Sequence, residues 1–160
     1  MQRCSTRKVG LLLGMLSLGA AACGDDFAPI RSGRYEAWYL TRSDNSTVKD
    51  LGSAAMEIDR DNEEMRLWDT DGSQITGAIR QVALDDPPTG CPTMYTQTEL
   101  EILAVDLPSV EVAGVTFDSP HLVADCGGSI MLRDGRSDLS VSDCGPAGEG
   151  YPCGAFSRAD

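Results

Sequence analysis

The sequence is poor in residues on which much protein chemistry depends. It has one histidine, two lysines and 13 basic residues in all against 25 acidic ones, a formal net charge of −12. This balance excludes a protein that binds nucleic acid by neutralising phosphates, because such binding needs a basic face. A single histidine also disfavours most metal sites and acid–base mechanisms. The 160 residues suffice for one domain, and 41% hydrophobic residues are typical of a folded chain.

Residues 1–22 have the layout of a secretory signal peptide. Three basic residues precede an apolar run, residues 9–18, which is too short to span a bilayer comfortably, and small residues follow up to Ala22. Cys23 comes directly after them, so the segment resembles the lipobox of bacterial lipoproteins. The resemblance implies cleavage before Cys23, acylation of its thiol and a membrane anchor there. The alternative is cleavage by the ordinary signal peptidase near Ala22, which leaves Cys23 as a free or paired thiol.

The mature chain that this processing predicts is strongly acidic. Removal of residues 1–22 takes away three of the 13 basic residues and none of the 25 acidic ones, which leaves a net charge of −15. Such a charge favours a soluble monomer and repels anionic headgroups, so attachment would depend on the acyl chains. Residues 23–32 are then the acylated cysteine and a tether, of which residues 24–32 reach about 30 Å when extended. Gly24 stands where inner-membrane lipoproteins carry Asp, so the resemblance implies the outer membrane.

Alternation with a period of two residues runs through residues 33–143, with almost no helical pattern. It predicts an all-β domain, an antiparallel meander of eight or nine short strands that forms a small barrel or sandwich. Asp71-Gly72 predicts a hairpin turn, residues 98–107 would also fit a helix, and residues 144–160 are predicted to be a disulfide-linked tail. The predicted strands are residues 34–41, 54–60, 65–68, 75–84, 93–105, 110–117, 121–125, 129–133 and 139–141.

The start of the meander is rich in aromatic residues. Alternation places Tyr35, Ala37 and Tyr39 on one face of the first strand, and Trp38 and Leu40 on the other. These aromatic residues and Trp68 would line a ligand pocket or, more commonly, belong to the core. The segment Gly33-Arg34-Tyr35 ahead of Trp38-Tyr39 resembles the opening of a lipocalin, which implies a barrel that carries a small apolar ligand.

Four cysteines remain after the anchor, and an even number in an exported chain predicts two disulfides. Their gaps of 35, 18 and 9 residues do not fit the paired spacings of a zinc site. A hairpin that turns at residues 134–136 would place Cys126 opposite Cys144, so we predict Cys126–Cys144 together with Cys91–Cys153. The alternative is a local Cys144–Cys153 bridge across a segment rich in glycine and proline.

Two acidic turns resemble fragments of a calcium loop. Asp59, Asp61 and Glu63 alternate, and Asp69-Thr70-Asp71-Gly72 follows the next predicted strand. Neither completes the twelve-residue calcium pattern, and a strand between the turns would hold Glu63 and Asp69 about 20 Å apart. We therefore expect solvated turn carboxylates and no metal site.

Two further arrangements would suit catalysis. His121 lies near Asp118 and Asp125 in the sequence, but Asp125 is about 13 Å away along an extended strand and no nucleophile motif accompanies the pair. Glu99 and Glu101 share one strand face at about 7 Å, which suits a pair of hydrolytic carboxylates or a solvated outer face.

No catalytic, metal or cofactor motif is complete, so we predict no catalytic residue and no cofactor. The sequence favours an exported, monomeric envelope lipoprotein, anchored through Cys23, whose β domain contacts another envelope protein and binds no nucleic acid. One alternative is a lipocalin-like carrier, which needs a cavity of about 300 Å³ or more. The other is a hydrolase that uses Glu99 and Glu101.

Overall fold

The computed structural model describes residues 30–83, 100–125, 128–139, 144 and 150–159. Within these residues the chain forms ten strands and no helix, which confirms the all-β prediction. The strands are β1 (Gly33–Thr41), β2 (Ala55–Asp59), β3 (Glu64–Trp68), β4 (Gln74–Gln81), β5 (Ile102–Val105), β6 (Ser109–Val112), β7 (Val115–Asp118), β8 (His121–Ala124), β9 (Ile130–Arg133) and β10 (Cys153–Arg158).

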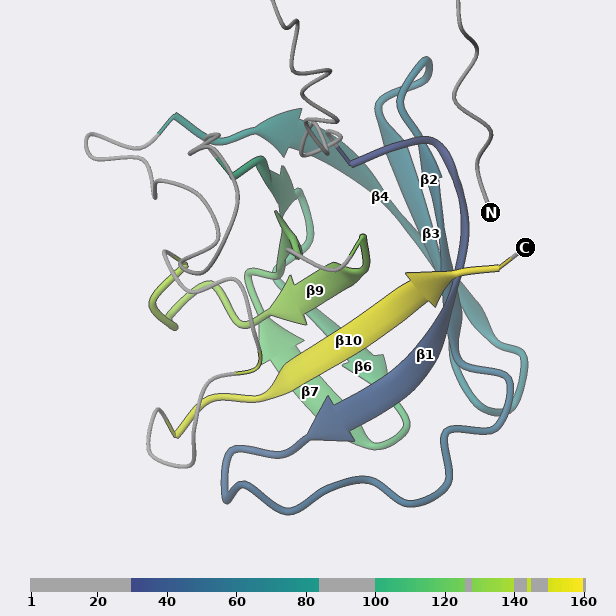
Figure 1. Cartoon of the computed structure of the whole chain (residues 1–160), viewed down its shortest axis with the longest axis vertical. Helices are drawn as coiled ribbons and strands as arrows, with labels where there is room; N and C mark the ends of the chain where they lie inside the picture. Colours follow the sequence, from purple (N-terminus) through teal and green to yellow (C-terminus); the bar gives the residue numbers. More distant parts are fainter. Residues whose placement is uncertain (1–29, 84–99, 126–127, 140–143, 145–149, 160) are drawn as a thin grey trace, which may run out of the picture.

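Eight of these strands close into an antiparallel barrel in the order β1-β10-β9-β8-β5-β4-β3-β2 (Figure 1). Every barrel strand lies beside the barrel strand that precedes it in the chain, so the barrel is the predicted meander. The remaining two strands, β6 and β7, form a separate hairpin inserted between β5 and β8. The architecture is therefore a closed barrel, and a sandwich is ruled out.

The local sequence explains most of the barrel strands. In the β2–β3 hairpin, Met56 and Ile58 alternate with more polar neighbours and pack against Leu67 and Met65, their partners across the ladder. The next turn is the predicted one. Gly72 has a φ of 81°, which an L side chain rarely adopts, and its N–H donates a hydrogen bond of 3.0 Å to the Asp69 carbonyl.

Strand β1 departs from the predicted alternation because it contains a β-bulge. Its register against β10 shifts between Ala37 and Tyr39, and the faces exchange at that point. Tyr35 and Leu40 are therefore both buried in the core, whereas the prediction placed them on opposite faces. Trp38, at the bulge, is 58% exposed.

The predicted strand over residues 110–117 is wrong in one respect, because it folds back on itself as the β6–β7 hairpin. Ala113 and Gly114 form the turn with φ values of 50° and 70°. Positive φ is uncommon for alanine, so the dipeptide Ala113-Gly114 does not predict a turn. Four hairpin residues join the barrel core, namely Val110, Val112, Val115 and Phe117.

The C-terminal segment also differs from the prediction of a tail. Cys153–Arg158 forms β10, which pairs with β1 on one side and β9 on the other and so closes the barrel (Figure 1). Both edges of β9 are thereby occupied, by β8 and β10. Leu139 lies in a turn, and the rest of the strand predicted at residues 139–141 lies outside the described residues. Residues 102–105 form a strand instead of the alternative helix.

All eight barrel strands contribute buried apolar side chains to one core cluster. Eight strands enclose a space just wide enough for inward-facing residues to fill. One apolar cluster unites these residues with the hairpin, and its largest fully buried members are Leu40, Met56, Ile58, Met65, Leu67, Leu103, Phe117, Leu122, Ile130, Leu132 and Phe156. A second buried cluster combines Ile102, Val123, Met131, Cys153 and Ala155, which alternate with these residues along β5, β8, β9 and β10.

Candidate functional site

The chain is fastened to the barrel from the first described residue. Ile30 is buried, and its backbone N–H donates a 2.6 Å hydrogen bond to Glu101 Oε2. Glu101 Oε1 forms an ion pair of 2.8 Å with Arg60 Nη2, and the Arg60 backbone N–H donates to Ser32 Oγ at 2.9 Å. The last three residues of the predicted tether thus belong to the folded domain. Cys23, the predicted lipidation site, lies outside the described residues.

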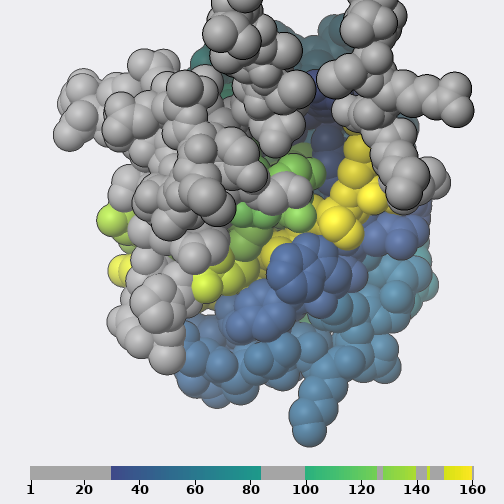
Figure 2. Space-filling view, viewed as in Figure 1, coloured from purple at the N-terminus to yellow at the C-terminus, as the bar shows by residue number. Residues whose placement is uncertain are grey.

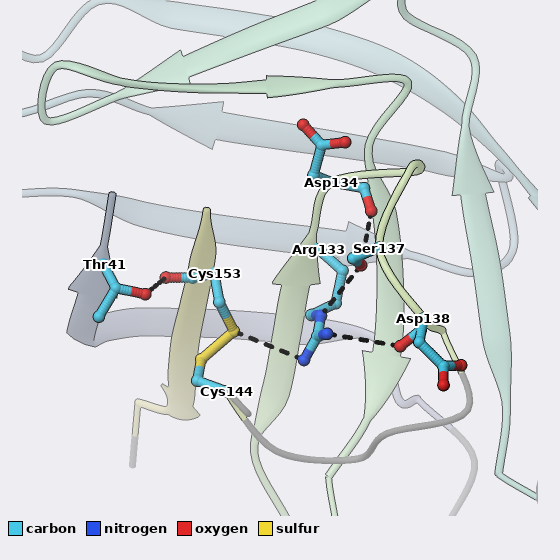
Figure 3. The surroundings of a disulfide bond; sticks show 7 residues. All are labelled: Thr41, Arg133, Asp134, Ser137, Asp138, Cys144 and Cys153. Carbon is cyan, nitrogen blue, oxygen red and sulfur yellow. Dashed lines mark hydrogen bonds between the residues drawn. A yellow bond between two sulfur atoms is a disulfide. The ribbon is translucent and has the colours of Figure 1, made fainter. Parts of the chain in front are cut away.

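The structure overturns the predicted disulfide pairing. Cys144 and Cys153 are bonded, with an S–S distance of 2.07 Å and Cα atoms 5.5 Å apart (Figure 3). The prediction required residues beyond 138 to pair with β9, but β10 occupies that edge and brings Cys153 opposite Arg133. Cys126–Cys144 and Cys91–Cys153 are therefore wrong, and the local alternative is correct. Cys91 and Cys126 themselves lie outside the described residues.

A buried polar cluster, Arg133, Asp134 and Ser137, follows β9. Arg133 is 1% exposed and Asp134 is fully buried. The Arg133 guanidinium donates to Ser137 Oγ at 3.3 Å and to the Asp138 carbonyl at 3.4 Å, and its Nη1 lies 3.9 Å from Cys153 Sγ (Figure 3). The Ser137 hydroxyl donates to the Asp134 carbonyl at 2.7 Å. This cluster therefore holds the guanidinium against the disulfide.

The Asp134 carboxylate ties the turn after β9 to the hairpin. It accepts hydrogen bonds from the Asp118 backbone N–H at 2.9 Å and from the Arg136 backbone and side chain at 2.8–2.9 Å. Burial raises the pKa of Asp134, but these hydrogen bonds outweigh it and leave the pKa below its ordinary value. The sequence predicted only a tight turn here, because Asp-Gly is common in exposed turns and does not indicate that the aspartate is buried.

His121 does not form the catalytic pair that its neighbours in the sequence suggested. It opens β8, lies opposite Arg133, and is half-buried. Burial lowers the pKa of His121, an effect that the Ser119 backbone offsets only in part, so the imidazole is neutral at pH 7. Asp118 Oδ2 binds Arg136 at 3.1 Å, and Asp125 follows the opposite end of the strand.

Three of the acidic residues considered as calcium ligands, Asp59, Asp69 and Asp71, accept hydrogen bonds from residues in turns. Asp59 accepts hydrogen bonds from the backbone and side chain of Asn62 at 3.1 and 2.7 Å, and these bonds lower its pKa. Asp71 accepts from the Ser73 N–H at 2.7 Å, and Asp69 accepts from the Ala113 N–H at 2.6 Å. In the described part of the chain, no group of three histidine, cysteine or acidic residues is placed to hold a metal ion.

Of the two glutamates of the hydrolase alternative, the structure describes Glu101. Glu101 is committed to Arg60 and to the Ile30 backbone, whereas Glu99 lies outside the described residues. The described member therefore fastens the start of the domain to the barrel. This is a structural role that the sequence pattern did not reveal.

The aromatic residues are distributed over both faces of the barrel. Tyr35 lies in the core, where its hydroxyl donates to the Arg31 carbonyl at 2.9 Å and burial raises its pKa. Trp68 lies beneath the Arg34 guanidinium, 4.7 Å from the ring centroid. Trp38 packs against only Tyr39 among the ring contacts of the described residues, with centroids 5.8 Å apart. These side chains do not gather into one pocket.

Comparisons with known proteins give no relative: no family model, no curated protein and no solved structure matches the chain. Among the described residues, no helix is long and apolar enough to cross a membrane. A functional assignment must therefore rest on the residues and their arrangement.

Proposed function

We propose that the protein is a non-catalytic binding or scaffold module of the bacterial cell envelope, exported and anchored in the outer membrane by acylation of Cys23. The observation that carries this proposal is the single apolar cluster inside the barrel. Buried side chains from the barrel strands and from the β6–β7 hairpin form this cluster, whereas a carrier needs a cavity of about 300 Å³ or more. Partners therefore meet the outside of the barrel.

The fastening at Ile30 supports a short attachment to the membrane. Six residues, 24–29, separate Cys23 from the hydrogen bond between Ile30 and Glu101. Seven extended steps span at most about 25 Å, so an acyl anchor on Cys23 would keep the barrel close to the bilayer. The acidic mature chain would not bind anionic headgroups by itself, which makes the acyl chains necessary.

The outer surface of β1 offers a contact for a protein partner. Trp38 is the most exposed large apolar side chain among the described residues, and the bulge in β1 holds it outward. Strands β1 and β10 lie side by side on the face shown in Figure 2, in blue and yellow. Exposed tryptophans are common energetic centres of protein interfaces. We place the partner contact at Trp38.

The anchor and the contact require separate experiments. Cells fed an alkyne analogue of palmitate should label the wild-type protein and not Cys23→Ser, whose signal peptide should remain uncleaved. An unmodified cysteine at the mature N-terminus would refute the anchor.

For the contact, a photo-crosslinking residue at position 38 should capture one envelope protein in cells. The same residue at Thr76, an exposed position on β4, serves as the control and should capture none. Equal capture from both positions would refute the contact. A small apolar ligand that co-purifies in native mass spectrometry would refute the scaffold module and favour a carrier.

A further inference from the structure

We propose that the Cys144–Cys153 disulfide is a directional thiol-exchange site, at which an external thiolate attacks Cys144 and Cys153 departs as a thiolate held by Arg133. The partner is a thiol compound, either a low-molecular-weight thiol or the active-site thiol of a dithiol protein. The site consists of Cys144, Cys153 of β10, Arg133 of β9 and the turn after β9. It is independent of the proposed lipid anchor.

The two cysteines differ in exposure. Cys153 is 5% exposed and begins β10, where its carbonyl accepts a hydrogen bond from Thr41 Oγ1 at 3.3 Å. Cys144 lies outside the ladder and is only partly buried. An attacking thiolate approaches one sulfur in line with the S–S bond and expels the other. Attack at the sulfur of the more exposed residue, Cys144, therefore makes Cys153 the leaving group.

The buried guanidinium favours the same direction. Arg133 Nη1 lies 3.9 Å from Cys153 Sγ. The side chain is 1% exposed, so solvent screens its charge little, and the bonds to Ser137 Oγ and the Asp138 carbonyl fix its position. A neighbouring cation stabilises a thiolate, and a stabilised thiolate leaves faster.

The exchange is balanced without a further reactant. The external thiolate forms a new S–S bond with Cys144 Sγ, the Cys144–Cys153 bond breaks, and its electron pair remains on Cys153 Sγ. A second external thiolate can then attack the sulfur of the first external thiol in the mixed disulfide. This releases an oxidised thiol dimer and leaves Cys144 as a thiolate. The protein disulfide is reduced by two electrons and the external thiols are oxidised by two.

The barrel can persist through this exchange. Strand β10 is held by a ladder to β1 from Tyr35 to Thr41 and by a second ladder to β9 from Ile130 to Arg133. Cys153 is therefore kept beside Arg133 after the S–S bond has broken, and the adduct resides on Cys144.

The first experiment locates the adduct. The mature protein is incubated with reduced glutathione, quenched in acid, alkylated with N-ethylmaleimide, digested without reductant and mapped by mass spectrometry, which reads each cysteine separately. We expect glutathione on Cys144 and N-ethylmaleimide on Cys153. Glutathione on Cys153, an equal distribution, or exchange only after denaturation would overturn the proposal.

The second experiment tests Arg133. In the fully reduced protein, the alkylation rate of Cys153 should reach half its maximum at a lower pH than that of Cys144. Arg133→Gln should remove this difference and slow the glutathione exchange several-fold, Arg133→Lys should retain most of both, and Arg80→Gln, an exposed control on β4, should change neither. A higher half-maximum pH for Cys153 in the wild type would overturn the proposal, even if Arg133→Gln fails to fold.

Discussion

Ile30 and Glu101 are joined by a hydrogen bond between the backbone N–H of one and the carboxylate of the other, across 71 positions of the sequence. The same carboxylate binds Arg60, so three segments meet at one side chain that is 12% exposed. This contact fixes the place at which the chain enters the barrel.

Removal of that carboxylate should loosen the entry of the chain. We expect Glu101→Ala to lower the free energy of unfolding by about 1–3 kcal/mol, because it leaves a buried N–H and a guanidinium unpaired. Glu101→Gln should be milder, since its amide oxygen can still accept from Ile30. Urea unfolding of both variants measures the difference. Asp106→Ala, which breaks an exposed pair with Arg80, is the control and should change stability by about 0.5 kcal/mol or less.

Asp134 should be the most sensitive acidic residue of the described chain. Its carboxylate accepts from Asp118 and Arg136 while fully buried, and Asp134→Asn would turn an amide N–H toward at least one of these donors. We expect a loss of about 2–4 kcal/mol in the free energy of unfolding. Asp71→Asn alters an exposed turn of similar form and should have a much smaller effect. Equal losses for the two variants in urea would contradict this role.

The half-buried imidazole predicts a stability that declines in mild acid. The folded pKa of His121 lies below its ordinary value of 6.5, so the unfolded chain binds the proton more readily. Stability is therefore complete above about pH 6.5 and falls as the pH decreases below it. His121→Gln should flatten this decline in the melting temperature between pH 7 and pH 5. The lowered pKa of Asp134 produces a further loss that begins below the ordinary aspartate range, and this loss should remain in the variant.

The β6–β7 turn should respond oppositely to changes at its two residues. Ala113 adopts a φ of 50°, which strains an alanine, whereas asparagine tolerates this conformation. We expect Ala113→Asn to stabilise the protein by about 0.5–1 kcal/mol. Gly114→Ala, at a φ of 70° with open space around it, should destabilise it by about 1 kcal/mol. Thermal unfolding decides, and the same sign for both variants would show that the turn is not under this strain.

The strands that the sequence predicted well have one buried face and one exposed face. In β3, buried Met65 and Leu67 alternate with partly exposed neighbours, so the apolar residues recur at every second position. Strand β10 is different because both of its faces are covered: Phe156 packs into the barrel and Ala155 into the second cluster. Small residues buried on both faces leave no alternation, so the strand that closes the barrel is not visible in the sequence pattern.

The same missing strand explains the error in the disulfide. The predicted pairing assumed that residues after the turn lie beside β9, because the sequence pattern does not reveal β10. The buried cluster was missed for a related reason, since Arg133 and Asp134 look like ordinary turn residues until β10 and the hairpin cover them. Long-range pairing, which local pattern does not encode, decides both features.

The pairing of β1 with β10 also orders the folding of the chain in time. Tyr35 meets Arg158 across the seam, so the first and last strands of the barrel must both exist before it can close. A nascent chain that has not yet produced β10 has an open edge on β1 and another on β9, even when the earlier hairpins have formed. Contacts so distant in sequence form slowly. The barrel therefore closes only after β10 has been synthesised, and the chain keeps two open strand edges until then.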